Sequence, residues 1–100
     1  MTDINCLIID DEEMNLKLLR QMVETHCRQV KVLATSSCAK AGLQMIEELH
    51  PQLVFLDVEM PHMNGFDLLQ KLEPVSFEVI FVTAYSHYAV EAFEHHATGY

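Results

Sequence analysis

Residues 6–13 read CLIIDDEE, an apolar run that passes directly into four acidic side chains. A short, uninterrupted apolar run is typical of a strand buried on both faces of a parallel sheet. Neighbouring carboxylates repel one another, and each raises the pKa of the next. The sequence therefore predicts that something at the end of this strand offsets the repulsion.

The rest of the chain alternates short apolar strands with helical stretches. Strands are predicted over residues 4–9, 30–34, 53–56 and 79–82, and a fifth begins at residues 98–100. Helices are predicted over residues 12–28 and 85–95, to residue 50 after an N-cap at Thr35, Ser36 or Ser37, and in a short segment that stops before Pro74. This alternation predicts a doubly wound α/β fold, a parallel sheet with helices on both faces.

Composition limits the classes of function. The chain has 100 residues, enough for one domain, and half of them are apolar, as in globular proteins. A net charge of -9 argues against binding to nucleic acid or an anionic membrane by this segment. No apolar run approaches the ~20 residues that span a bilayer, and the first residues lack the pattern of a signal peptide. The three cysteines fit neither a disulfide framework nor a zinc site, and we expect reduced thiols in a cytoplasmic protein.

Polar side chains follow three of the predicted strands. Asp10 and Asp11 follow the first, Asp57 the third and Thr83 the fourth. The carboxyl ends of parallel strands meet at one edge of a sheet, so these groups converge if the strands are neighbours. Mg²⁺ prefers such oxygen ligands and would offset the repulsion. The alternative for Asp10 or Asp11 alone is an N-cap of the helix that follows, but neither Asp57 nor Thr83 precedes a clear helix start.

At these residues the chain resembles the receiver domains of two-component response regulators. The motifs are IIDDE at residues 8–12, LVFLDVEMPHMNG at residues 53–65 and VIFVTAY at residues 79–85. Their order and spacing match the family, and the resemblance covers essentially the whole chain. Residues 82–100, VTAYSHYAVEAFEHHATGY, are similar to the LytR/AlgR type, whose receivers precede a LytTR DNA-binding domain.

The resemblance implies a flavodoxin-like strand order of 2-1-3-4-5, and a role for each matching residue. Asp57 would accept a phosphoryl group from a phosphohistidine of a sensor histidine kinase. Asp10, Asp11 and Asp57 would bind Mg²⁺, together with the backbone carbonyl of Glu59. A carboxylate nucleophile needs no general base, because it is ionised at pH 7.

The resemblance also implies a switch. Thr83 would donate a hydrogen bond to the phosphoryl group, and Tyr100 matches the aromatic residue that moves inward in response. The domain would not be an enzyme with turnover, although it would catalyse its own phosphotransfer and slow dephosphorylation. It would relay the signal to a DNA-binding output domain that is absent from residues 1–100, and it would not contact a membrane.

The chain departs from the family at its carboxyl end. Family members carry a Lys in the fifth strand beyond the switch aromatic, and this chain stops at Tyr100. We therefore interpret residues 1–100 as an incomplete receiver that lacks this Lys, most of the fifth strand and the last helix. The missing elements would leave one sheet edge and part of one face uncovered, so we expect a homodimer or a domain swap.

Three other functions remain as alternatives. Phosphohydrolases of the haloacid dehalogenase type also place a nucleophilic Asp after an apolar strand, but they use Asp where Glu59 stands and place the nucleophile on the first strand. A flavodoxin-like nucleotide binder needs a phosphate loop after the first strand, where DDEE would repel phosphate. A receiver-like domain that only binds partners is the third.

Overall fold

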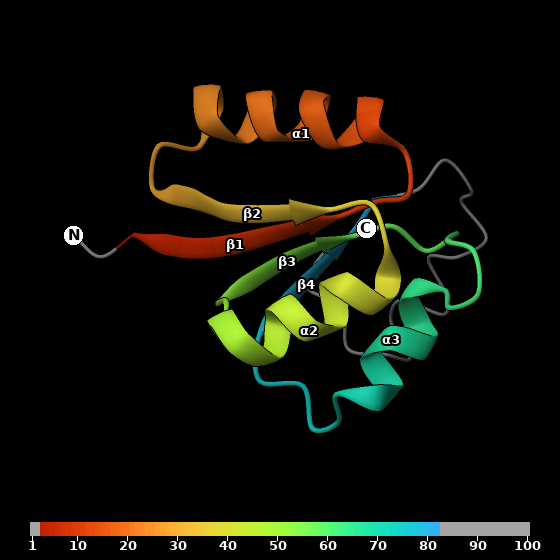
Figure 1. Cartoon of the computed structure of the whole chain (residues 1–100). Coiled ribbons are helices and arrows are strands. Elements are labelled where there is room, and N and C mark those ends of the chain that lie inside the picture. The colour runs from red at the N-terminus through yellow and green to blue at the C-terminus, as the bar shows by residue number, and fades with distance from the viewer. Residues whose placement is uncertain (1–2, 83–100) are drawn as a thin grey trace.

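The computed structural model describes residues 3–82, and Figure 1 shows how their strands and helices alternate. The elements are β1 (Ile4–Ile9), α1 (Glu13–His26), β2 (Val30–Ser36), α2 (Ala39–Leu49), β3 (Leu53–Leu56), α3 (Gly65–Lys71) and β4 (Glu78–Phe81). The strands pair in parallel in the order β2-β1-β3-β4, which confirms the predicted fold for these four strands. The predicted helix at 85–95, the fifth strand, Thr83 and Tyr100 lie outside the described residues.

Strand β1 is buried on both faces, as its apolar run predicts. Leu7 and Ile9 belong to a core that includes residues of α2 and α3, whereas Cys6 and Ile8 belong to a second core under α1. Figure 1 shows α1 on one side of the sheet and α2 and α3 on the other. Each fully buried aliphatic side chain contributes about 1.5–3 kcal/mol to folding, so burial of both faces of β1 favours helices on both sides of the sheet.

The structure corrects the start of the second helix. Strand β2 continues to Ser36, two positions beyond its predicted end, because Thr35 and Ser36 still pair with β1. The N-cap of α2 is Cys38, so the predicted caps at Thr35, Ser36 and Ser37 are wrong. The Ser36 hydroxyl instead accepts a hydrogen bond from the Cys38 amide and donates one to the Cys38 carbonyl. The serine therefore shapes the turn between strand and helix without capping the helix.

Candidate functional site

Three carboxylates lie together where β1 and β3 end. The two strands are neighbours in the sheet, and the Asp57 amide donates to the Ile9 carbonyl at 2.9 Å. This bond brings the residue after β3 beside Asp10 and Asp11, which follow β1. One oxygen from each of the three carboxylates lies within 4.8 Å of the other two. The structure thus brings together the three acids that the strand ends predicted.

Backbone amides orient two of these carboxylates. The Glu12 amide donates to Asp10 Oδ1 at 2.9 Å, and the Glu59 amide donates to Asp57 Oδ1 at 3.2 Å. Each bond closes the turn that an Asp side chain makes with the amide two residues later. The N-cap of α1 is Glu12, which makes no side-chain cap bond, so the alternative in which Asp10 or Asp11 is the cap residue is wrong.

Burial makes this cluster costly when no cation is bound. The pKa of Asp57 is raised to about 7, first by burial, then by the charge of Asp10 and a hydrogen bond with Asp11. Burial also raises the pKa of Asp10, whose side chain is only 4% exposed, although the Glu12 amide opposes that shift. The sequence predicts an ionised Asp57 at pH 7, because the ordinary pKa of an aspartate is about 3.9. In the cation-free protein, however, this carboxyl is only partly ionised at that pH.

The donor set fits a hard divalent cation. The ligands are all carboxylate oxygens, which Mg²⁺ prefers, and Mg²⁺ usually keeps several waters beside one or two carboxylates. Asp10, Asp11 and Asp57 each place one oxygen within 4.8 Å of the others and would hold the ion from the protein side. A cation would also favour the ionised form of Asp57 and lower its pKa.

The loop after β3 is held against the site by α3. The Gly65 amide donates to the Val58 carbonyl at 2.9 Å. Asn64 caps the helix through a reciprocal pair of bonds, in which its side chain accepts from the Asp67 amide and the Asp67 carboxylate accepts from the Asn64 amide. This capping box was not predicted, although an Asn followed three residues later by an acidic residue is its signal in the sequence.

Gly65 allows α3 to approach the backbone of Asp57. A Cβ at this position would lie 2.6 Å from the Asp57 carbonyl oxygen and 3.3 Å from the Val58 Cα, distances that the backbone cannot tolerate without moving. We expect Gly65→Ala to lower the free energy of unfolding by about 1–3 kcal/mol, because overpacking forces a backbone shift. Urea denaturation followed by circular dichroism measures this loss.

The matched control is Gln70→Ala on the exposed side of the same helix. It should change the free energy of unfolding by no more than about 0.5 kcal/mol, as is usual for surface substitutions. Equal stability of the Gly65→Ala and wild-type chains would show that the close approach is not needed.

Comparison with known proteins agrees with this geometry. Residues 6–100 match the response regulator receiver domain. An uncharacterized response regulatory protein of Vibrio cholerae is 41% identical over 98 residues, which cover 97% of this chain and 41% of that protein. The transcriptional regulatory protein BtsR of Escherichia coli is 33% identical over 98 residues, with the same coverage of 97% and 41%. The chain thus spans about two fifths of the length of these relatives.

Solved structures share the fold. The response regulatory domain of protein mrkE from Klebsiella pneumoniae superposes with a TM-score of 0.87 at 26% identity, over 97% of this chain and 80% of that one. The response regulator domain of Thermotoga maritima CheB gives a TM-score of 0.83 at 22% identity, over 97% and 75%, a likeness of fold alone. Within residues 3–82, every helix is too short or too polar to cross a bilayer. From its motifs, its strand order and these matches, the chain belongs to the family of response regulator receiver domains.

Proposed function

We propose that residues 1–100 form the receiver domain of a longer response regulator, and that Asp57 accepts a phosphoryl group from a sensor histidine kinase. The observation that carries this proposal is the convergence of Asp10, Asp11 and Asp57 at the junction of β1 and β3, in a chain of the receiver family. Phosphorylation-dependent signalling is the function of that family. The proposal adds that Asp57 is the residue that accepts the phosphoryl group.

The chemistry follows from the position of Asp57. Its carboxylate oxygen attacks the phosphorus of a phosphohistidine, the phosphorus–nitrogen bond breaks, and the electron pair stays on the imidazole nitrogen. Asp10, Asp11, Asp57 and the Glu59 carbonyl would hold Mg²⁺, which supplies charge neutralisation to the transferring group. The backbone hydrogen bond from Asp57 to Ile9 holds the nucleophile beside the end of β1. The transfer therefore depends on positioning rather than on a general base.

The proposal extends to residues outside the described range. Thr83 would donate a hydrogen bond to a phosphoryl oxygen. Tyr100 would move inward in response and so transmit the phosphorylation signal to an output domain. The name of the relative BtsR, a transcriptional regulatory protein, supports a DNA-binding output, and we propose the LytTR type and a cytoplasmic location. A homodimer or a domain swap remains part of the proposal, and light scattering that shows a clean monomer at high concentration would count against it.

Incubation with acetyl phosphate and Mg²⁺ tests the proposal directly. Intact-mass measurement should show one added phosphoryl group, and a chelator should prevent its addition. Continuous hydrolysis of a small phosphate ester would instead favour the phosphohydrolase alternative. A chain that gains no phosphoryl group would be the receiver-like domain that only binds partners.

An exposed apolar row on α1 supports a partner at this edge. Met14, Leu18 and Met22 are 68%, 53% and 58% exposed, and their spacing of four residues places them on one face of the helix. Helix α1 begins directly after the acidic cluster, at the edge where β1 and β3 end (Figure 1). A donor histidine must reach Asp57 from outside this edge, so we assign the row to the kinase contact.

Leu18→Glu should separate docking from chemistry. Placing a charge at the centre of the apolar row should slow phosphotransfer from a phosphorylated sensor kinase by about tenfold or more, because central apolar contacts dominate interface energies. Phosphorylation by acetyl phosphate should be unchanged, because this small donor needs no docking surface. Phosphoprotein gels for the first reaction and intact mass for the second measure the two rates.

Gln44→Glu is the matched control, since it adds the same charge to an exposed position of α2, on the opposite side of the sheet from α1. It should leave both rates at the wild-type level. An equal loss for both donors in Leu18→Glu, or an equal effect of Gln44→Glu, would show that the row is not part of the kinase contact.

A further inference from the structure

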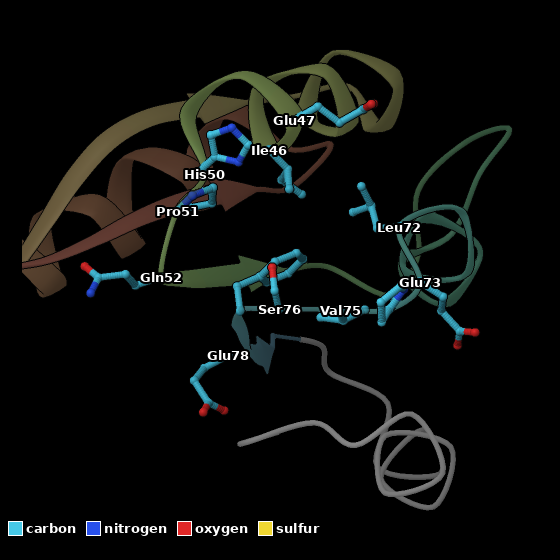
Figure 2. A pocket seen from close by; sticks show the side chains of 12 residues that line it. Ile46, Glu47, His50, Pro51, Gln52, Leu72, Glu73, Val75, Ser76 and Glu78 are labelled. Atoms are coloured by element: carbon cyan, nitrogen blue, oxygen red, sulfur yellow. The ribbon is translucent and has the colours of Figure 1, made fainter.

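A cavity of about 1240 Å³ (Figure 2) opens beside the start of β3, at the end of that strand opposite to the acidic cluster. It lies between the end of α2, the residues that precede β3, the segment 72–77 that joins α3 to β4, and the first residue of β4. Gln52 lines it directly before β3, whereas Asp57 follows that strand. At ~3.3 Å per residue, roughly 16 Å of strand separates the cavity from the phosphoacceptor, so it belongs to no part of the site described above.

The floor of the cavity is apolar and continuous with the core. Ile46 is 4% exposed, and Leu72, Val75 and Phe77 are partly buried and pack against the larger core cluster. In Figure 2 the side chains of Ile46 and Leu72 point toward one another across the hollow. The floor is therefore part of the folded core rather than a mobile surface, and it offers apolar area to an aliphatic side chain.

The margin of the cavity is acidic. Glu47 from α2, Glu73 after α3 and Glu78 at the start of β4 are exposed around it, and Figure 2 shows their carboxylates at its edges. The lining residues, which all lie within the described part of the chain, include no Lys or Arg. Three carboxylates around an apolar floor complement a cationic ligand that also carries apolar groups.

We propose that this cavity docks a positively charged peptide segment of a partner protein, with a leucine-like side chain anchored on Ile46 and Leu72 and basic side chains at Glu47 and Glu73. Charge selects this occupant over the others. A second copy of a chain with a net charge of -9 would add repulsion at the margin, and a phosphate or nucleic acid would meet three carboxylates. The interaction is independent of Asp57 and so lies beyond the proposed phosphotransfer.

The test uses defined probe peptides and the 100-residue chain labelled with ¹⁵N. The probe is an amphipathic peptide of Lys, Leu and Ala, about 12 residues or three helical turns long. At physiological salt, amide shifts should change for the non-proline residues of 46–52 and 72–78 and leave those beside Asp10 and Asp57 unchanged. Two altered peptides should each bind at least about tenfold more weakly. One has Glu in place of Lys and loses the attraction to the acidic margin, and the other has Ala in place of Leu and loses the apolar contact with the floor.

Two exposed neighbours on α2 provide the matched variants. Glu47→Lys reverses a charge at the margin and should lower the affinity for the Lys–Leu peptide by about threefold to tenfold. Glu48→Lys makes the same change on a residue that does not line the cavity, and screening at this salt should limit its effect to less than about twofold. Both variants should still accept a phosphoryl group from acetyl phosphate, which separates this test from that of the proposed function.

Several outcomes would overturn the proposal. Shifts centred on the acidic cluster, or equal losses in Glu47→Lys and Glu48→Lys, would mean diffuse attraction to an acidic chain. If the leucine-free peptide bound as tightly as the Lys–Leu peptide, the apolar floor would not contribute to binding. Shifts at residues 46–52 that depend on the concentration of the chain alone would assign the cavity to a second copy.

Discussion

Asp57→Asn should abolish phosphorylation of the chain by acetyl phosphate, with a loss of at least about 100-fold in rate. The amide carries no negative charge and is a far weaker nucleophile than a carboxylate. The substitution keeps the shape of the side chain, and Asn makes the same turn to the amide two residues later, so the bond from Glu59 can persist. The loss therefore reports chemistry rather than unfolding, and intact-mass spectrometry after incubation with Mg²⁺ measures it.

Asp3→Asn serves as the control for this substitution. Asp3 is exposed and precedes β1, at the opposite end of the strand from the cluster. The same change of charge there should leave phosphoryl uptake at the wild-type rate. A normal mass increase in Asp57→Asn would show that another carboxylate is the acceptor, and peptide mapping would identify it.

The stability of the cation-free chain should fall as pH rises from 3.8 to about 7. Burial first, and Asp10 second, raise the pKa of Asp57 from 3.8 to about 7. The folded chain therefore binds more protons than the unfolded chain within this window, and the contribution of Asp57 to the unfolding free energy decreases as pH rises. Three pKa units correspond to about 4 kcal/mol, but solvent screening of this half-buried carboxyl reduces the expected loss to about 1–2 kcal/mol.

Urea denaturation in the presence of a chelator measures this effect as a difference between variants. Asp57→Asn should exceed the wild type in unfolding free energy by about 1–2 kcal/mol at pH 7.5, and the difference should vanish toward pH 4. With Mg²⁺ present, the wild type should become the more stable of the two chains. An ion that binds only the folded state adds about 2.7 kcal/mol to the unfolding free energy at 100 times its dissociation constant. A difference that stays constant with pH would show that Asp57 does not carry the electrostatic cost.

The sequence was sufficient for the features that depend on alternation and strand ends. The apolar run of β1 predicted burial on both faces, and acids after two neighbouring strands predicted their convergence, because parallel strands leave little freedom at their carboxyl edge. The boundary of β2 was less predictable, since Thr35 and Ser36 suit both a strand and a cap, and pairing with β1 decided between them. No sequence pattern predicts the cavity, because it depends on how residues 72–78 pack beside α2.

The bonds from the Glu12 and Glu59 amides also divide each aspartate into two unequal oxygens. Oδ1 of Asp10 and of Asp57 accepts a hydrogen bond from the main chain, which holds each carboxylate in one orientation. This arrangement selects for side-chain length as well as charge. A glutamate, one methylene longer, would carry the same charge but could not close the same ring with the amide, so acidity alone does not reproduce either residue.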